Sequence, residues 1–136
     1  MADISITAAN VVAGTNASPA TGTAGETITA GQVVYKSATT SKFMKADGDS
    51  ATAGATEPFG IALNGASLNQ PLSVLKAGPI TIGATLTAGT AYYLGDDPGG
   101  ICPLADLATG DDVVLIGLAT TTAILDVDFQ ISGVTL

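Results

Sequence analysis

Aspartate pairs are the residues in this chain with the clearest capacity for chemistry. They are Asp47 with Asp49, Asp96 with Asp97, Asp111 with Asp112, and Asp126 with Asp128. Calcium needs several oxygen ligands from one shaped loop, and none of these segments matches the EF-hand loop with its terminal bidentate glutamate. Aspartate beside glycine is typical of turns. We therefore interpret the pairs as turn-forming and solubilising residues, with a divalent-cation site at one of them as the alternative, and we assign no metal ligand.

The other residue types argue against an enzyme. The chain has no histidine, arginine or tryptophan and one cysteine, so it lacks a histidine base, a guanidinium fork and any cysteine-based metal cluster. Cys102 lies between Ile101 and Pro103, where we expect a small buried apolar side chain rather than a nucleophile. No serine nucleophile elbow or phosphate-binding loop is present. We expect no catalytic residues and no cofactor.

Size and charge narrow the class of protein further. The 136 residues fit one domain. Twelve acidic residues and four lysines give a net charge of −8, which opposes binding to nucleic acid. No uninterrupted apolar stretch is long enough to cross a membrane. The N-terminus lacks the pattern of a secretion signal, so we expect synthesis in the cytoplasm.

The apolar pattern predicts an all-β fold. No window sustains helical periodicity, whereas alternation is clear near the C-terminus, where Leu125, Val127, Phe129 and Ile131 share one predicted face. Other short strand signals occur at residues 4–6, 33–36, 72–76, 79–82, 92–94 and 113–119. Many short strands between turn residues predict a small barrel or sandwich.

An internal repeat divides the predicted β domain into two halves. Residues 25–35 read GETITAGQVVY and residues 83–93 read GATLTAGTAYY, and the later strings FGIA and IGLA also correspond. We therefore predict two half-repeats, at about 25–65 and 83–123, within one β domain over residues 25–136. Tyr35 and Tyr93 occupy equivalent positions, which favours a packing role.

Glycines and the N-terminal segment complete the predicted organisation. Gly31 and Gly89 follow Thr-Ala and are predicted to have positive φ, whereas Gly60 and Gly117 interrupt strand patterns, as at a bulge, a tight barrel or a subunit interface. Residues 13–24 carry no large apolar side chain. We predict that residues 1–24 form a flexible arm.

Several short strings of this chain lie at residues 25–35, 42–47 (KFMKAD), 60–64 (GIALN), 83–94 and 98–101 (Pro-Gly-Gly-Ile). They resemble those of the capsid cement, or head decoration, proteins of tailed bacteriophages. The resemblance covers roughly residues 25–125. It implies a β-rich homotrimer on the outer capsid surface of the virion, which bridges neighbouring major capsid subunits and stabilises the shell. The family has no catalytic residues to carry over.

A second class of structural protein remains open. Gly/Thr-rich β-repeats also occur in phage tail fibres, so the alternative is a trimeric module of a tail fibre or receptor-binding protein. The aromatic content of 4% and the lack of a long fibrous repeat count against it. In either case we expect protein partners, with no nucleic acid and no membrane.

Overall fold

The computed structural model describes residues 4–15, 17–48, 54–95 and 97–136. Within them the chain forms strands and two short 3-10 helices, η1 (Ala8–Asn10) and η2 (Leu104–Asp106). The strands are β1 (Val12–Ala13), β2 (Ser18–Thr23), β3 (Val33–Lys36), β4 (Phe43–Lys45), β5 (Gly60–Ala62), β6 (Pro71–Thr81), β7 (Ala91–Leu94), β8 (Ile101–Pro103), β9 (Asp112–Ala119) and β10 (Ile124–Thr135). The all-β prediction is confirmed.

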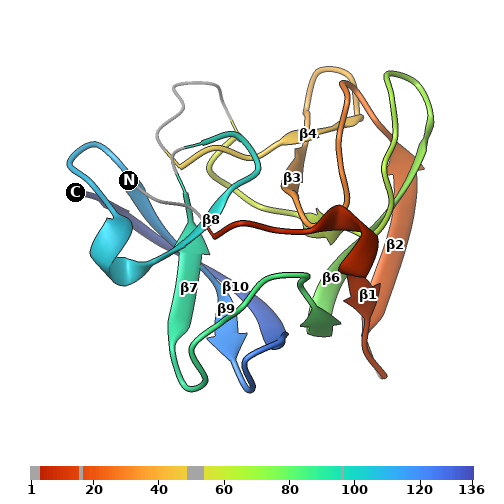
Figure 1. Cartoon of the computed structure of the whole chain (residues 1–136). Helices are drawn as coiled ribbons and strands as arrows, with labels where there is room; N and C mark the ends of the chain where they lie inside the picture. The colour runs from red at the N-terminus through yellow and green to blue at the C-terminus, as the bar shows by residue number, and fades with distance from the viewer. Residues whose placement is uncertain (1–3, 16, 49–53, 96) are drawn as a thin grey trace.

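The strand order shows the internal repeat directly. The main path is β4-β3-β5-β6-β10-β9-β7-β8, so the order on one side of the β6–β10 pair mirrors the order on the other. All the strand pairs are antiparallel. Figure 1 shows the two halves side by side, with β2, β3 and β4 in one and β7, β9 and β10 in the other.

The register of the strands repeats as well as their order. Equivalent residues of the two halves face equivalent partners: Tyr35 with Met44 and Tyr93 with Cys102, Lys36 with Phe43 and Leu94 with Ile101, and Val34 with Gly60 and Tyr92 with Gly117. The turns agree too, because Gly31 and Gly89 both have positive φ and donate to the carbonyls of Ala62 and Ala119. The two halves therefore share one local fold.

Strand β6 belongs to both halves, so the structural repeat is longer than the predicted one. Its residues 71–77 pair with β2, and its residues 78–81 pair with β10. The partners change at Gly78, which has a φ of +101° that glycine adopts without steric cost. The sequence predicted separate strands at 72–76 and 79–82. We define the first unit as residues 18–77 and the second unit as residues 78–135.

Residues 12–13 and 18–23 of the N-terminal segment form strands of the sheet, contrary to the prediction of a flexible arm over residues 1–24. Strand β2 pairs with β6 along its whole length, and Ala24 is fully buried and bridges to Phe43 of β4, which closes the first unit into a small barrel. The sequence of β2 did not predict a strand, because it carries no large apolar side chain. Small residues suffice there because Gly22 lies against the Phe43 ring, where a Cβ would come within 2.4 Å of it.

Residues 4–13 close the second unit in a similar way. The N–H of Ile4 donates to the carbonyl of Ile101 in β8 at 2.8 Å, and the N–H of Thr7 donates to Gly83 at 2.8 Å. Strand β1 then pairs with β6. No strand forms at residues 4–6, although their pattern predicted one. The segment runs between β8 and β1 in Figure 1 and fills the position that the chain before β3 fills in the first unit.

Two apolar cores hold the structure together. The smaller lies inside the first unit and includes Ile28, Val34, Phe43 and Leu72. The larger draws on both units, with Ile61 and Leu75 from the first and Ile116 and Leu125 from the second. The larger core therefore joins the two units into one domain.

The C-terminal strand follows its predicted alternation only in part. Leu125 and Val127 are buried, and Asp126 and Asp128 are exposed. Phe129 is half-buried against the larger core, whereas Ile131 is 53% exposed. The pairing of β10 with β9 shifts between residues 127 and 130, β10 leaves β6 after residue 127, and residues 130–135 of the strand are exposed.

Gly60 and Gly117 are explained within one chain. A Cβ at Gly117 would lie 2.2 Å from the carbonyl oxygen of Asp126, and one at Gly60 would lie 3.0 Å from the carbonyl oxygen of Leu75. The first contact is backbone against backbone, which leaves no room for a side chain. These glycines therefore serve close strand packing, and they give no support to a subunit interface.

Candidate functional site

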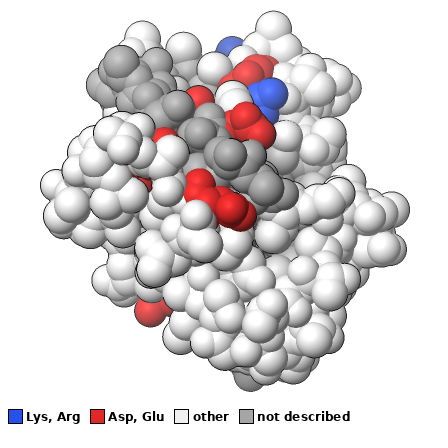
Figure 2. Space-filling view, turned by 60° about the vertical axis from the view of Figure 1, so that its left-hand side comes forward, with Lys and Arg blue, Asp and Glu red and all other residues white. Residues whose placement is uncertain are grey.

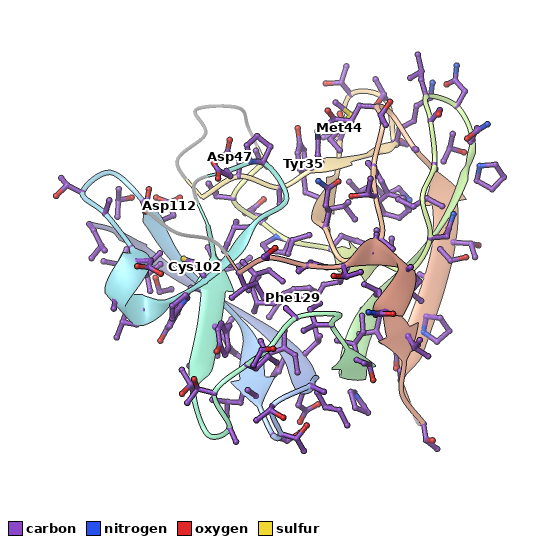
Figure 3. The ribbon with its side chains drawn as sticks, viewed as in Figure 1. Tyr35, Met44, Asp47, Cys102, Asp112 and Phe129 are labelled. Atoms are coloured by element: carbon purple, nitrogen blue, oxygen red, sulfur yellow. The ribbon has the colours of Figure 1, made fainter. Side chains whose placement is uncertain are left out.

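The fold brings loops that carry three of the aspartate pairs to one end of the molecule. Gly48, beside Asp47, donates to Gly95 at 2.8 Å, and Asp112 donates from its N–H to the carbonyl of Gly48 at 2.8 Å. Figure 3 shows Asp47 and Asp112 on the same side of the molecule, and Figure 2 shows acidic side chains gathered on one face. The pair at residues 126 and 128 lies apart, on β10.

The described aspartates of this end have structural roles. Asp111 is 2% exposed, and its Oδ2 accepts a hydrogen bond from the N–H of Ala108 at 2.9 Å. Asp112 accepts from the hydroxyl of Thr135, and the carbonyl of Asp97 accepts from Gly100 in a turn. Asp49 and Asp96 lie outside the described residues. In the part of the chain that is described, no three His, Cys, Asp or Glu side chains gather as a metal site would require.

Cys102 is fully buried in β8, as the sequence predicted. Tyr35 is also buried, whereas its counterpart Tyr93 is only half-buried. The tyrosine with a hydrogen-bonding role is Tyr92, whose hydroxyl accepts from the N–H of Thr87 at 3.0 Å. That bond fixes the turn before β7. The larger core includes Tyr35 and Tyr92, so on β7 the packing role that was predicted for Tyr93 belongs to its neighbour Tyr92.

An open pocket of about 240 Å³ lies between the N-terminal segment and two turns. Ile4, Ile6, Gln32 and Pro98 contribute to its walls, and Asp97 is the one ionisable side chain among the described residues that line it. General acid–base chemistry needs groups within hydrogen-bond reach of one another. The described lining residues of this pocket offer a single carboxylate and therefore no such pair.

A cluster of two lysines and one phenylalanine lies on the first unit. The ammonium groups of Lys36 and Lys76 lie 6.0 and 5.6 Å from the centroid of the Phe59 ring, a cation–π distance. The ring in turn packs on Phe43, with the two centroids 5.2 Å apart. The sequence analysis missed this cluster because its members are far apart in the chain and share no period. Only the pairing of β3, β5 and β6 brings them together.

Large apolar side chains are exposed mainly on the second unit. Among the described residues, those at least half exposed are Val12, Leu68, Leu104, Leu118, Ile131, Val134 and Leu136. The last three lie on or beside residues 128–135 of β10, whose edge away from β9 pairs with no other described strand. A free strand edge with exposed apolar side chains is a surface to which another protein can add.

Comparisons of this chain with protein-family models, with curated proteins and with solved structures found no match. Among the residues that the structure describes, no helix has the length and apolar character to span a membrane.

Proposed function

We propose that this chain is a capsid decoration protein of a tailed bacteriophage, which binds the outside of the shell and stabilises it by bridging neighbouring major capsid subunits. The proposal rests on the resemblance of residues 25–125 to capsid cement proteins. In this proposal the chain works as a homotrimer. It is made in the host cytoplasm, and its final location is the outer capsid surface of the virion. It needs neither a cofactor nor a catalytic group.

The observation that carries the proposal is the free edge of β10. Ile131 and Val134 are 53% and 54% exposed on a strand whose outer edge has no described partner. A cement protein must present such a surface to proteins that are already assembled. Because each added subunit contacts several capsid subunits at once, many modest contacts reinforce one another. The net charge of −8 also disfavours binding of the protein to the packaged DNA, which is itself negatively charged.

Cosedimentation with capsids tests this surface. Purified phage capsids that lack the chain are mixed with the protein or with the variant I131K/V134K. We expect the natural protein to sediment with capsids and to raise their thermal disruption temperature, and we expect the variant to do neither. The matched control is V12K/L68K, which changes two equally exposed apolar residues away from β10.

Two results would overturn the proposal. One is equal capsid binding by I131K/V134K and the natural protein, which would remove β10 as the docking edge. The other is antibody labelling of intact virions at the tail tip instead of the head, as seen by negative-stain microscopy. That pattern would identify the chain as a module of a tail fibre or receptor-binding protein.

A further inference from the structure

The charges of this chain are divided between its two units. All four lysines lie in the first unit, residues 18–77, which also holds four acidic residues. Residues 83–136 hold seven acidic residues and no basic one. The first unit is therefore close to neutral, and the second carries nearly all of the net negative charge. Charge separation of this kind favours contact between unlike surfaces of two molecules.

The lysines of the first unit differ in how they are used. Lys45 forms an ion pair with Glu26 at 3.8 Å, and Lys42 donates to the side chain of Asn69. Lys36 and Lys76 are exposed and share the half-buried Phe59 ring, and neither has a carboxylate within ion-pair distance among the described residues. We call Lys36, Phe59 and Lys76 the basic-aromatic surface.

A surface of the opposite kind lies on the second unit. Leu118 of β9 is 51% exposed and lies directly opposite Asp126 of β10, with exposed Asp128 two residues further along that strand. Neither carboxylate forms an ion pair with a described lysine. We call Leu118, Asp126 and Asp128 the acidic-apolar surface. Each of the two surfaces thus combines one apolar side chain with two like charges, and their signs are opposite.

We propose that the basic-aromatic surface of one copy of this chain binds the acidic-apolar surface of a second copy. The apolar groups Phe59 and Leu118 meet, and the lysines face the aspartates. A contact between two different surfaces is heterologous, and repetition around an axis closes it into a ring. This inference rests on the homotrimer of the proposed function, and it assigns the contact that builds the homotrimer without using Ile131 and Val134, the residues proposed to bind the capsid.

The charge-swap variant K36E/K76E/D126K/D128K provides the main test. It keeps the net charge at −8, because two lysines are lost and two are gained. Sedimentation velocity measures the mass of each variant in about 0.05 M and about 1 M sodium chloride, since salt screens exposed charges. We expect the natural chain to form a trimer at low salt, and we expect the association of its subunits to weaken at high salt.

The separate variants K36E/K76E and D126K/D128K should each weaken association at least about tenfold at low salt, because attraction becomes repulsion at every contact. The charge-swap variant should associate like the natural chain. K42E, on the same unit but away from the Phe59 ring, should have no such effect. A monomeric natural chain, an unaffected K36E/K76E variant or a charge-swap variant that stays dissociated would each overturn the inference.

Capsid cosedimentation of the same variants separates this inference from the proposed function. If K36E/K76E keeps its trimer and binds capsids, the contact is wrong and the proposed function stands. If K36E/K76E dissociates and the charge-swap variant reassociates, while none of the proteins binds capsids, the contact stands and the proposed function is wrong.

Discussion

At the scale of single residues, Gly117 is a position that leaves no room for a side chain. A Cβ there would lie 2.2 Å from the carbonyl oxygen of Asp126 on the neighbouring strand, and backbone cannot move aside as a flexible side chain can. We expect Gly117→Ala to lower the free energy of unfolding by about 3 kcal/mol. Urea denaturation followed by circular dichroism measures the change.

Gly65→Ala is the matched control. The nearest atom to a Cβ at Gly65 is 3.7 Å away, an ordinary contact, and φ there is not in the left-handed region. The free energy of unfolding should change by no more than about 0.5 to 1 kcal/mol, and in the stabilising direction. If both variants lost the same free energy of unfolding, the close contact between β9 and β10 would not be the reason for glycine at position 117.

The side chains of β10 provide a second prediction at this scale. Leu125 is fully buried, so Leu125→Ala should lower the free energy of unfolding by about 2 to 5 kcal/mol. Phe129 is only half-buried, so Phe129→Ala should lower it by less, about 1 to 3 kcal/mol. Asp126→Asn and Asp128→Asn should change the unfolding free energy by no more than about 0.5 kcal/mol. Thermal denaturation at high salt measures these effects without the contribution of subunit contacts.

The same measurement decides whether β10 binds a cation. Addition of a chelator should leave the melting temperature of the natural chain unchanged. A fall of several degrees both with chelator and in the two asparagine variants would make these carboxylates cation ligands.

At the scale of elements, the N-terminal segment is the part whose removal tests the fold most directly. Deletion of residues 2–24 removes β1, β2 and the bonds of Ile4 and Thr7, and it opens both units. We expect the truncated protein to lose its cooperative thermal transition, because β6 is left with a free edge and both cores lose cover. Scanning calorimetry measures this transition.

A shorter deletion separates the two contributions of this segment. Deletion of residues 2–17 keeps β2 and the closed first unit, so it should retain a cooperative transition at a lower temperature. A transition at the natural temperature after the longer deletion would instead support a dispensable arm.

At the scale of the whole molecule, the two units depend on one another. The larger core takes Ile61 and Leu75 from one unit and Ile116 and Leu125 from the other, and β6 pairs with strands of both. We therefore expect the fragments 1–82 and 83–136 to be unfolded when separate and to form native-like β structure when mixed. Two-dimensional NMR spectra of the fragments and their mixture measure this, and a well-dispersed spectrum of either fragment alone would contradict it.

The sequence by itself determined the class of fold and the repeat. Three signals are local, because they depend on the pleat of a strand and on backbone sterics. They are the alternation in residues 125–129, the Thr-Ala-Gly turns that contain Gly31 and Gly89, and the lack of helical periodicity. Composition likewise determined the strongly acidic character of the chain, with four lysines and twelve acidic residues. These properties need no knowledge of which strands pair.

The tertiary structure decided everything that depends on partners distant in the chain. Residues 18–23 lack large apolar side chains, yet they form a strand, because a long neighbour, β6, satisfies their backbone and a phenylalanine ring fills the space above Gly22. The basic-aromatic surface likewise exists only once β3, β5 and β6 are adjacent. Strand pairing is set by contacts between segments with no fixed spacing, and for that reason no local pattern could predict it.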